Sequence, residues 1–259
     1  MLQKEKDILS MKEQYKQMDL WLSYRLKYLM PKLLKECNID LWVILCSEYN
    51  EDPVFNSLTP SLMQNASRMS CLMFSLKDGN YRALSLCRPN GLLMDYYEQG
   101  YDAEKESQWE GIKRVIREHK GGKISVNVSS NSGMSDGLSK RLFDELTEGL
   151  DIELCTDTNI AIRWLETRSD DELNLYPDIY KIAMAIQKEA YSREVITPGV
   201  TTTTDLEWFI LQRINDMGLS AWFTPDVDLQ RPGKSGRGCA QLLTLSAYQS
   251  GYHQQLIRS

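Results

Sequence analysis

The chain has 259 residues, of which 42% are hydrophobic and 25% are charged, so it can bury a sizeable core in one large or two smaller domains. Its net charge of −6, with Lys and Arg scattered along the chain, gives no basic field for phosphates, and nucleic acid is not expected as a partner. The opening residues MLQKEKDILSMKEQYKQ lack the apolar centre of a secretory signal, and no stretch approaches the roughly 18 apolar residues of a membrane span. We therefore expect a cytoplasmic protein with no membrane partner.

The first predicted elements are a helix and a buried strand. Apolar side chains recur at three- and four-residue spacing between residues 11 and 33, which lines one face of a helix. Pro31 should kink or divide that helix, because proline has no backbone N–H. The run Leu41–Cys46, LWVILC, is continuously apolar, which is typical of a strand buried on both faces.

The next segments predict a hairpin, a helix and a strand. Cys71–Leu76 and Tyr81–Leu86 are apolar runs on either side of KDGN, and Asp-Gly can take the positive φ angles of a tight hairpin turn. A helix is expected at about Glu104–His119, where a following Gly-Gly pair supplies the stop, and a strand at Ile124–Val128.

A helix near Asp136–Glu148 and a strand at Ile152–Cys155 complete the first half of the chain. Strands that alternate with helices predict an α/β fold, a mixed sandwich with a largely open sheet. We place this α/β domain at residues 1–166.

Two further helices are expected in residues 167–233. A capping box at Ser169–Glu172, in which each side chain satisfies a backbone N–H, opens a helix that continues to about Ile196. A second capping box, at Thr204–Glu207, opens a helix that ends at Gly218.

Two short motifs suggest chemistry, but their surroundings argue against it. Residues 133–137, GMSDG, match a nucleophile elbow, yet the six residues SSNSGM separate Ser135 from the preceding strand, and we expect Ser135 to help cap the following helix. Gly233-Lys234-Ser235 resembles the end of a phosphate-binding loop, but the leading glycine of that pattern falls on Asp228. Neither a serine hydrolase nor an NTPase is favoured.

The candidate metal ligands are few and dispersed. Of the two histidines, His119 is expected to cap the end of its helix, where a cation suits the helix dipole, and His253 has no ligand partners near it in sequence. Asp226 and Asp228 would share one face of a strand, but a carboxylate pair without a third ligand is usually a solvated edge. The cysteines form no Cys-x-x-Cys pair and are expected to be buried free thiols: Cys37, Cys46, Cys71, Cys87, Cys155 and Cys239.

The second half carries a specific resemblance. The run from Arg168 to Gly233, with ITPGVTTTTDLEW and WFTPDVDLQR as its most particular parts, resembles the start of the metallopeptidase domain of the Xaa-Pro aminopeptidase, prolidase and creatinase family, the pita-bread fold. The residues before it resemble the α/β domain that precedes this start, and the likeness covers about residues 20–233. It implies a creatinase/prolidase-type N-terminal α/β domain with a mixed sheet, followed by an incomplete pita-bread α+β domain.

The family's chemistry is implied by that resemblance alone. Its members hold two divalent metals, commonly manganese, with two Asp, one His and two Glu, and these metals activate a water that attacks the peptide bond before proline. Peptides with proline at the second position are the implied substrate, and a homodimer is an implied assembly. The resemblance places no catalytic, cofactor-binding or metal-binding residue on this chain.

Residues 234–259, KSGRGCAQLLTLSAYQSGYHQQLIRS, contain no Asp or Glu and stand where the family's first metal ligands are expected. We call them the acid-free segment. With 36 acidic residues among 259, a run of 26 without one arises by chance about 2% of the time. The chain as given is therefore predicted to hold no catalytic metal and to be an inactive, truncated form of an Xaa-Pro aminopeptidase-like metallopeptidase.

Two explanations of the acid-free segment stay open. Either a frameshift near Lys234 replaced the original reading frame, or the gene ends this way and encodes a non-catalytic remnant. The first is favoured, because the segment has helix-length apolar content without capping or turn residues. The functional alternative is a peptide-binding, protein-binding or dimerising protein, since the same fold serves peptide recognition without metals in histone-chaperone subunits.

Overall fold

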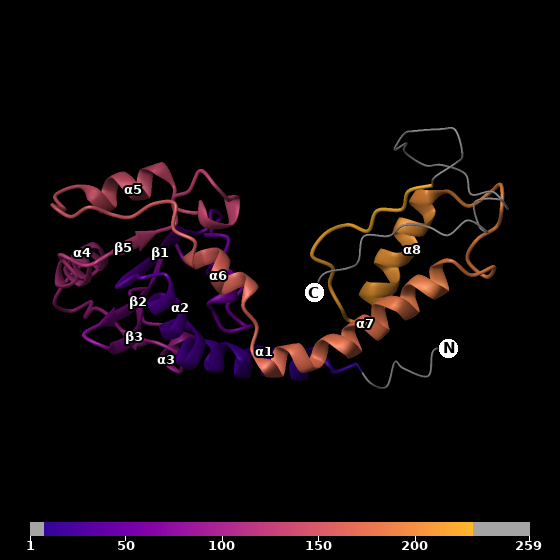
Figure 1. Ribbon diagram of the computed structural model, residues 1–259, viewed down its shortest axis with the longest axis horizontal. Helices are drawn as coiled ribbons and strands as arrows, with labels where there is room; N and C mark the ends of the chain where they lie inside the picture. The colour runs from indigo at the N-terminus through magenta and orange to yellow at the C-terminus, as the bar shows by residue number, and fades with distance from the viewer. Residues whose placement is uncertain (1–7, 230–259) are drawn as a thin grey trace. The chain divides into compact units, whose positions relative to one another are not determined.

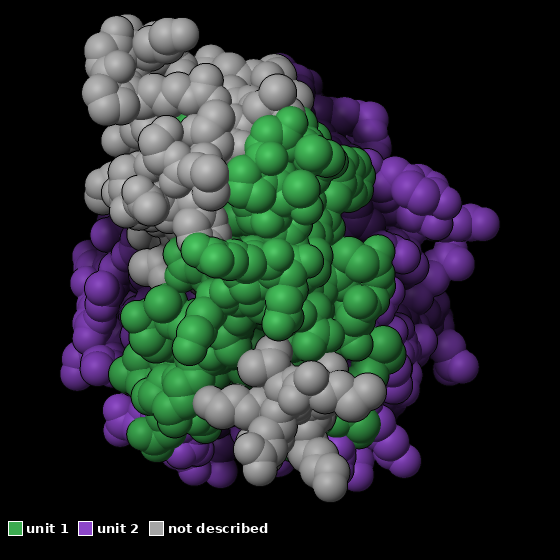
Figure 2. Space-filling view, turned by 90° about the vertical axis from the view of Figure 1, so that its right-hand side faces the viewer, with its two compact units in different colours: residues 1–11, 172–259 green, residues 12–171 purple. Residues whose placement is uncertain are grey.

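The computed structural model describes residues 8–229 and divides the chain into two compact units. Residues 12–171 form the larger one, which we call the α/β unit. Residues 1–11 and 172–259 form the other; we call its described part from residue 172 onward the helical unit, and Figure 2 colours the two differently. Between residues 8 and 229, none of the helices combines the length and hydropathy needed to cross a bilayer.

The α/β unit is built on one five-stranded mixed sheet with the strand order β4-β3-β2-β1-β5. β1 pairs antiparallel with β2, and β2 with β3, whereas the β1–β5 and β3–β4 pairs are parallel. The strands are β1 (Leu41–Ser47), β2 (Met69–Lys77), β3 (Asn80–Ser85), β4 (Glu98–Gln99) and β5 (Ile124–Val126). The prediction of an α/β fold with a mixed sheet is confirmed.

β1 is buried on both faces, as its continuous apolar run predicts. Trp42, Ile44 and Cys46 enter one hydrophobic core, and Leu41, Val43 and Leu45 enter the other, because side chains alternate along a strand. Figure 1 shows helices around the sheet, and the core residues assign each helix to a face. The first core takes α1, α2, α3 (Gly91–Met94) and α6 (Ile160–Glu166), and the second takes α4 and α5.

The N-terminal helix is divided as expected at Pro31. α1 (Met11–Tyr24) passes into one π-helical turn, Arg25–Leu29, before α2 (Met30–Glu36) begins. The Met30 N–H bonds the Arg25 carbonyl five residues earlier, so the turn widens just before the proline. A widened turn of this kind relieves the clash between the proline ring and the preceding turn.

The β2–β3 hairpin forms at the predicted Asp-Gly turn. Lys77 pairs with Asn80 across it, and the two central residues have positive φ, 49° at Asp78 and 77° at Gly79. Two positive φ angles in a two-residue loop define the turn that follows the right-handed twist of the strands.

Two predicted helix starts in this unit are wrong by about four residues. α4 (Gln108–Glu118) begins after Ser107 rather than at Glu104, because Ser107 and Glu110 form a capping box. α5 (Lys140–Thr147) begins after Ser139, whose hydroxyl accepts the Leu142 N–H.

Two predicted strands are also shorter than expected. β5 stops at Val126 instead of Val128. The run Ile152–Cys155 forms one isolated bridge, Ser125 to Cys155, instead of a strand. Short 3₁₀ turns that were not predicted lie at Phe55–Ser57 and Gly133–Ser135.

The helical unit contains α8 (Thr203–Asp216) and all of α7 (Asp170–Ala190) except its first two residues, which belong to the α/β unit. α7 ends at Ala190 rather than at Ile196, which instead turns into the unit's own core. The capping box of α8 is Thr202–Asp205, not Thr204–Glu207, because Thr202 is the extended residue whose hydroxyl accepts the Asp205 N–H. Glu207 instead accepts the Val227 N–H at 3.1 Å.

We expect Gly79→Ala to lower the free energy of unfolding by about 1–2 kcal/mol, because a Cβ at its φ of +77° is strained even though nothing lies within 4 Å. Gly91→Ala is the matched control, since Gly91 also has open space around it but no positive φ. Urea unfolding curves measure both, and an equal loss in the two variants would contradict the turn strain.

Candidate functional site

A surface hollow of about 930 Å³ lies on the α/β unit where the chain leaves β4 and approaches α4. Pro89, residues 99–106 and Arg114 line it. Sequence analysis singled out none of these residues, because their charges are separated along the chain and match no motif. The signal that could have indicated a polar surface is the acid-rich run DAEKE at residues 102–106.

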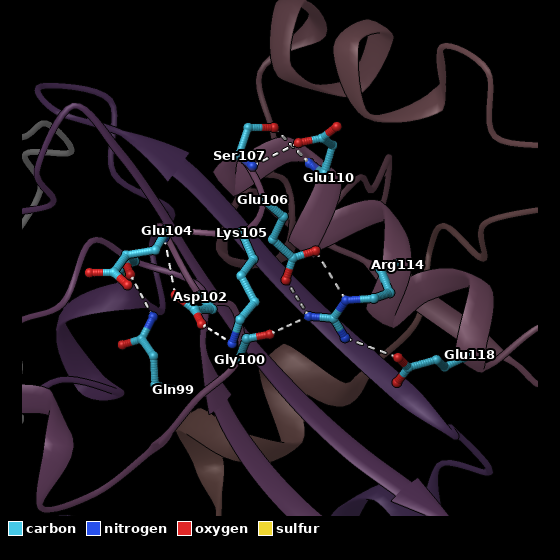
Figure 3. Close-up of polar contacts among 11 residues, drawn as sticks. Gln99, Gly100, Asp102, Glu104, Lys105, Glu106, Ser107, Glu110, Arg114 and Glu118 are labelled. Carbon is cyan, nitrogen blue, oxygen red and sulfur yellow. Dashed lines mark hydrogen bonds and ion pairs between the residues drawn. The ribbon is translucent and has the colours of Figure 1, made fainter.

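Arg114 is the centre of the polar contacts at this hollow (Figure 3). Its Nε and Nη2 donate to the two carboxylate oxygens of Glu106, at 3.1 and 2.7 Å. Its Nη1 donates to Glu118 at 3.0 Å, and its Nη2 also donates to the Gly100 carbonyl at 2.8 Å. One guanidinium therefore joins α4 to the segment after β4 by a bidentate pair with Glu106 and one bond to the Gly100 carbonyl, while its bond to Glu118 lies within α4.

The segment before α4 is folded by its own carboxylates (Figure 3). Asp102 accepts the Glu104 N–H at 3.0 Å and the Lys105 ammonium at 2.6 Å. Glu110 then accepts the Ser107 N–H at 2.7 Å and closes the capping box of α4. These bonds order the backbone before the helix starts.

Gly111 allows this segment to lie against α4. A Cβ at Gly111 would lie 2.5 Å from the Tyr101 Cβ, which is closer than two carbon atoms can approach. Sequence patterns do not reveal that requirement, because glycine inside a helix is usually unfavourable.

The electrostatics of the hollow suit binding better than acid–base catalysis. The bond from Arg114 lowers the pKa of Glu106, and the bond from Lys105 lowers the pKa of Asp102. The Glu106 carboxylate, in turn, raises the pKa of Arg114. A general acid or base works best with a pKa near the operating pH, whereas the pKa values of these three groups are shifted away from neutral pH.

A second polar cluster is buried at the carboxyl ends of the parallel strands β1 and β5. Asn127, directly after β5, donates to both oxygens of Asp52 at 3.0 Å and accepts the Trp42 indole N–H at 2.8 Å. Asp52 also accepts the Val54 N–H at 3.0 Å. Burial raises the pKa of Asp52 to about 6, although the bonds from Val54 and Asn127 oppose this shift.

The Asp52 cluster is closed to substrates. Asp52 is only 2% exposed. A Cβ at Gly137 would lie 2.3 Å from its carboxylate, so the Gly137 backbone passes directly against it. A carboxyl group with a pKa near 6 would otherwise be a candidate acid or base, but here its bonds hold β1 to β5.

Ser135 is not a nucleophile, and it is not the helix cap that we predicted. It is 3% exposed and its hydroxyl donates to the Ser132 carbonyl at 3.1 Å. The cap of α5 is Ser139, because the chain makes a 3₁₀ turn before that helix begins.

His119 lies at the end of α4, where it was predicted. Its Nδ1 is 2.8 Å from the Val115 carbonyl, in the last turn of the helix. Its Nε2 is 2.7 Å from the Ser75 hydroxyl on β2, a contact that the sequence did not predict. The ring is buried and fastens α4 to the sheet.

Asp226 and Asp228 share an outward face, because Val227 and Leu229 between and after them turn into the core of the helical unit. Among residues 8–229, no three His, Cys, Asp or Glu side chains come together in a way that could hold a metal. His253 and Gly233-Lys234-Ser235 lie outside the described residues.

The cysteines of the described part are free thiols, as expected. Cys46, Cys71 and Cys87 are buried, whereas Cys37 and Cys155 are partly buried, and Cys239 lies outside the described residues. Burial raises the pKa of Cys46 to about 12, so this thiol stays protonated and unreactive at neutral pH.

Comparison with known proteins finds similarity in structure only. No protein-family model and no curated protein matches the sequence. The crystal structure of X-Pro aminopeptidase from Thermotoga maritima MSB8 is similar with a TM-score of 0.52 and 10% identity, over 82% of this chain and 57% of that one. The chain therefore spans less than two thirds of that enzyme.

Two other solved structures are similar over comparable lengths. The Xaa-Pro dipeptidase from Bacillus anthracis has a TM-score of 0.49 and 13% identity, over 86% of this chain and 58% of that one. The prolidase from Pyrococcus horikoshii OT3 has a TM-score of 0.48 and 13% identity, over 85% and 57%. At this identity, the comparison with the Thermotoga structure shows the fold alone: a mixed α/β architecture that is similar to part of an X-Pro aminopeptidase.

We expect Arg114→Ala to lower the free energy of unfolding by about 1 kcal/mol, because it removes a bidentate pair and two further bonds from a partly exposed site. Arg141→Ala is the matched control, since Arg141 makes a single exposed pair with Glu145 on α5 and should lose a few tenths of a kcal/mol at most. Urea unfolding at low salt measures both. Equal losses would show that Arg114 does not hold the segment after β4.

Asp52 should make stability depend on pH. The folded chain binds the Asp52 proton more tightly than the unfolded chain does, with a pKa of about 6 against 3.8. The stability that the Asp52 side chain contributes is therefore fully present below about pH 4 and is lost as the pH rises through 6. Relative to Asp52→Asn, the unfolding free energy of the natural chain should fall by about 2–3 kcal/mol between pH 4 and 7. Parallel pH profiles of the two chains would contradict this assignment.

Proposed function

We propose that this chain is Xaa-Pro aminopeptidase-like, and that its described residues correspond to the N-terminal α/β domain and the first helices of the catalytic domain of such a metallopeptidase. The observation that carries the proposal is the likeness to the Thermotoga X-Pro aminopeptidase over 82% of this chain. Residues 12–171 make up less than two thirds of the chain, so a match of that extent must continue beyond the α/β unit. The substrate of the intact relative would be a peptide with proline at the second position.

The α/β unit would serve such an enzyme by shaping the approach to the active site. Its surface hollow is lined by ordered backbone and paired charges, which suits contact with a peptide or a neighbouring domain rather than bond cleavage. In this proposal, peptide hydrolysis belongs to residues outside the α/β unit.

Residues 8–229 do not bring together the ligands of a dinuclear metal centre. Asp226 and Asp228 face outward from a short segment, and no further carboxylate or histidine joins them within the part of the chain that the structure describes. In the printed sequence, no Asp or Glu follows Asp228. We therefore assign no metal-dependent step to this chain and propose that it does not cleave peptides as given.

The test is an assay of the 259-residue chain with an Xaa-Pro peptide in the presence of added Mn²⁺. We expect no release of the N-terminal residue above a control that contains Mn²⁺ and peptide alone, because two metals need about five protein ligands to activate water. Circular dichroism should first establish that the α/β unit is folded.

Turnover that depends on Mn²⁺ and disappears with a chelator would contradict the proposal of an inactive chain. A calorimetric titration with Mn²⁺ provides a second measurement that does not depend on the choice of peptide. Tight binding of two metal ions per chain would equally contradict it.

A further inference from the structure

Asp52 is a buried carboxyl group without a cationic partner. Its oxygens accept bonds from the Asn127 amide and the Val54 N–H, which are both uncharged donors. Among residues 8–229, no Lys, Arg or His side chain bonds to it. Ionisation at this position is costly, because a buried charge without an opposite charge loses its hydration. Asp52 must therefore either keep its proton or regain contact with water.

The loop between β5 and α5 lies directly against this carboxyl group. We call residues 129–137 the cover loop. A Cβ added to Gly137 would lie 2.3 Å from Asp52 Oδ2 and 2.4 Å from its Cγ, so the loop backbone touches the carboxyl group. The loop ends at Leu138, whose N–H bonds the Asn127 carbonyl at 2.9 Å. Water reaches Asp52 from this side only if the loop moves.

The cover loop is held largely by bonds within itself. The N–H groups of its middle residues bond to other residues of the loop: Asn131 to Ser129, Met134 and Ser135 to Ser132, and Asp136 to Gly133. Its first residues are attached to Asp157, which accepts the Ser130 N–H at 2.7 Å. Within residues 129–137, only Ser135 is buried. The middle of the loop can therefore move without breaking a helix or the sheet.

The titratable groups near Asp52 are Asp136 on the cover loop, Cys46 on β1 and Glu51, which precedes it in the chain. Burial raises the pKa of Asp52, and the negative charge of Asp136 adds to the rise. Burial also raises the pKa of Cys46 to about 12, so this thiol stays neutral. An ionised Asp52 therefore repels the loop that carries Asp136.

We infer that the cover loop is a pH-sensitive lid, which stays closed while Asp52 is protonated and opens more often when Asp52 is ionised. Opening hydrates the carboxylate and takes Asp136 away from it, whereas β1 and β5 stay paired in the sheet. It also exposes Asp52 and Asn127 at the carboxyl ends of two parallel strands, a position where α/β proteins often bind ligands. The lid thus controls access to this position.

Native-state hydrogen exchange followed by mass spectrometry tests the inference on the full chain. Exchange rates of peptides within residues 129–138, divided by the intrinsic rate at each pH, give the open fraction of the lid. The closed lid holds the Asp52 proton with a pKa of about 6, against 3.8 for a hydrated carboxyl group. The open fraction should therefore rise at least about tenfold, and at most on the order of a hundredfold, between pH 4 and 7.

Asp52→Asn removes the titrating group and should make the open fraction of the lid independent of pH in this range. Asp151→Asn is the matched control, since Asp151 belongs to the same unit and its side chain is fully exposed. The control should keep the rise between pH 4 and 7.

Gly137→Ala is a second variant, which keeps the Asp52 carboxyl group. The added Cβ clashes with that group, so the lid should exchange at least about tenfold faster than in the natural chain at pH 4. Gly133→Ala is its matched control, because Gly133 lies in the same loop and nothing is within 4 Å of an added Cβ. It should leave the exchange of the lid unchanged.

Peptides within residues 41–47 of β1 supply the reference for unfolding of the whole unit, and they should exchange more slowly than the lid at each pH. Equal rates in β1 and the lid would overturn the inference, because Asp52 would then be hydrated only by unfolding of the unit. An open fraction that is the same at pH 4 and 7 in the natural chain would also overturn it, since the loop would then open without hydrating Asp52.

Discussion

The α/β unit depends on the complete burial of β1. Its six apolar residues alternate between two hydrophobic cores, and its backbone is satisfied by β2 on one side and β5 on the other. The chain must therefore provide helices for both faces of the sheet, which α2 and α6 do for one and α4 and α5 for the other. Polar groups buried beside such a strand need hydrogen-bond partners. The bonds among Trp42, Asn127 and Asp52 supply these partners where β1 lies next to β5.

This arrangement explains why the most perturbed carboxyl group of the unit is not a catalytic one. Asp52 lies at the carboxyl ends of parallel strands, where α/β proteins often bind ligands. In this chain the Gly137 backbone closes the position, and the carboxylate is used to join two strands. The charged groups of the surface hollow lie instead around Arg114, whose bonds to Glu106 and to the Gly100 carbonyl fix the segment before α4. The described bonds of the α/β unit hold its strands and helices in place, and its fold is similar to that found in an X-Pro aminopeptidase.

The helical unit poses the opposite problem, because it has more apolar surface than its two helices can cover. The same helix that contributes Ile186 and Ala190 to the core presents Tyr180 and Met184 to solvent. A two-helix unit cannot bury both faces of a helix, so a third element must cover the second face or leave it in water.

The sequence by itself determined the elements whose signals are local. The continuous apolar run of β1, the Asp-Gly turn and the division of a helix at Pro31 each depend on neighbouring residues, and all three were predicted. Where two capping residues lie close together, the sequence analysis chose the wrong one. Ser107 starts α4 at Gln108, and Thr202 rather than Thr204 caps α8. Only the tertiary structure decided that Asp52 meets Asn127, 75 residues away, and that Arg114 holds the segment after β4. Such contacts follow from how strands pair and helices pack, and no spacing along the chain encodes them.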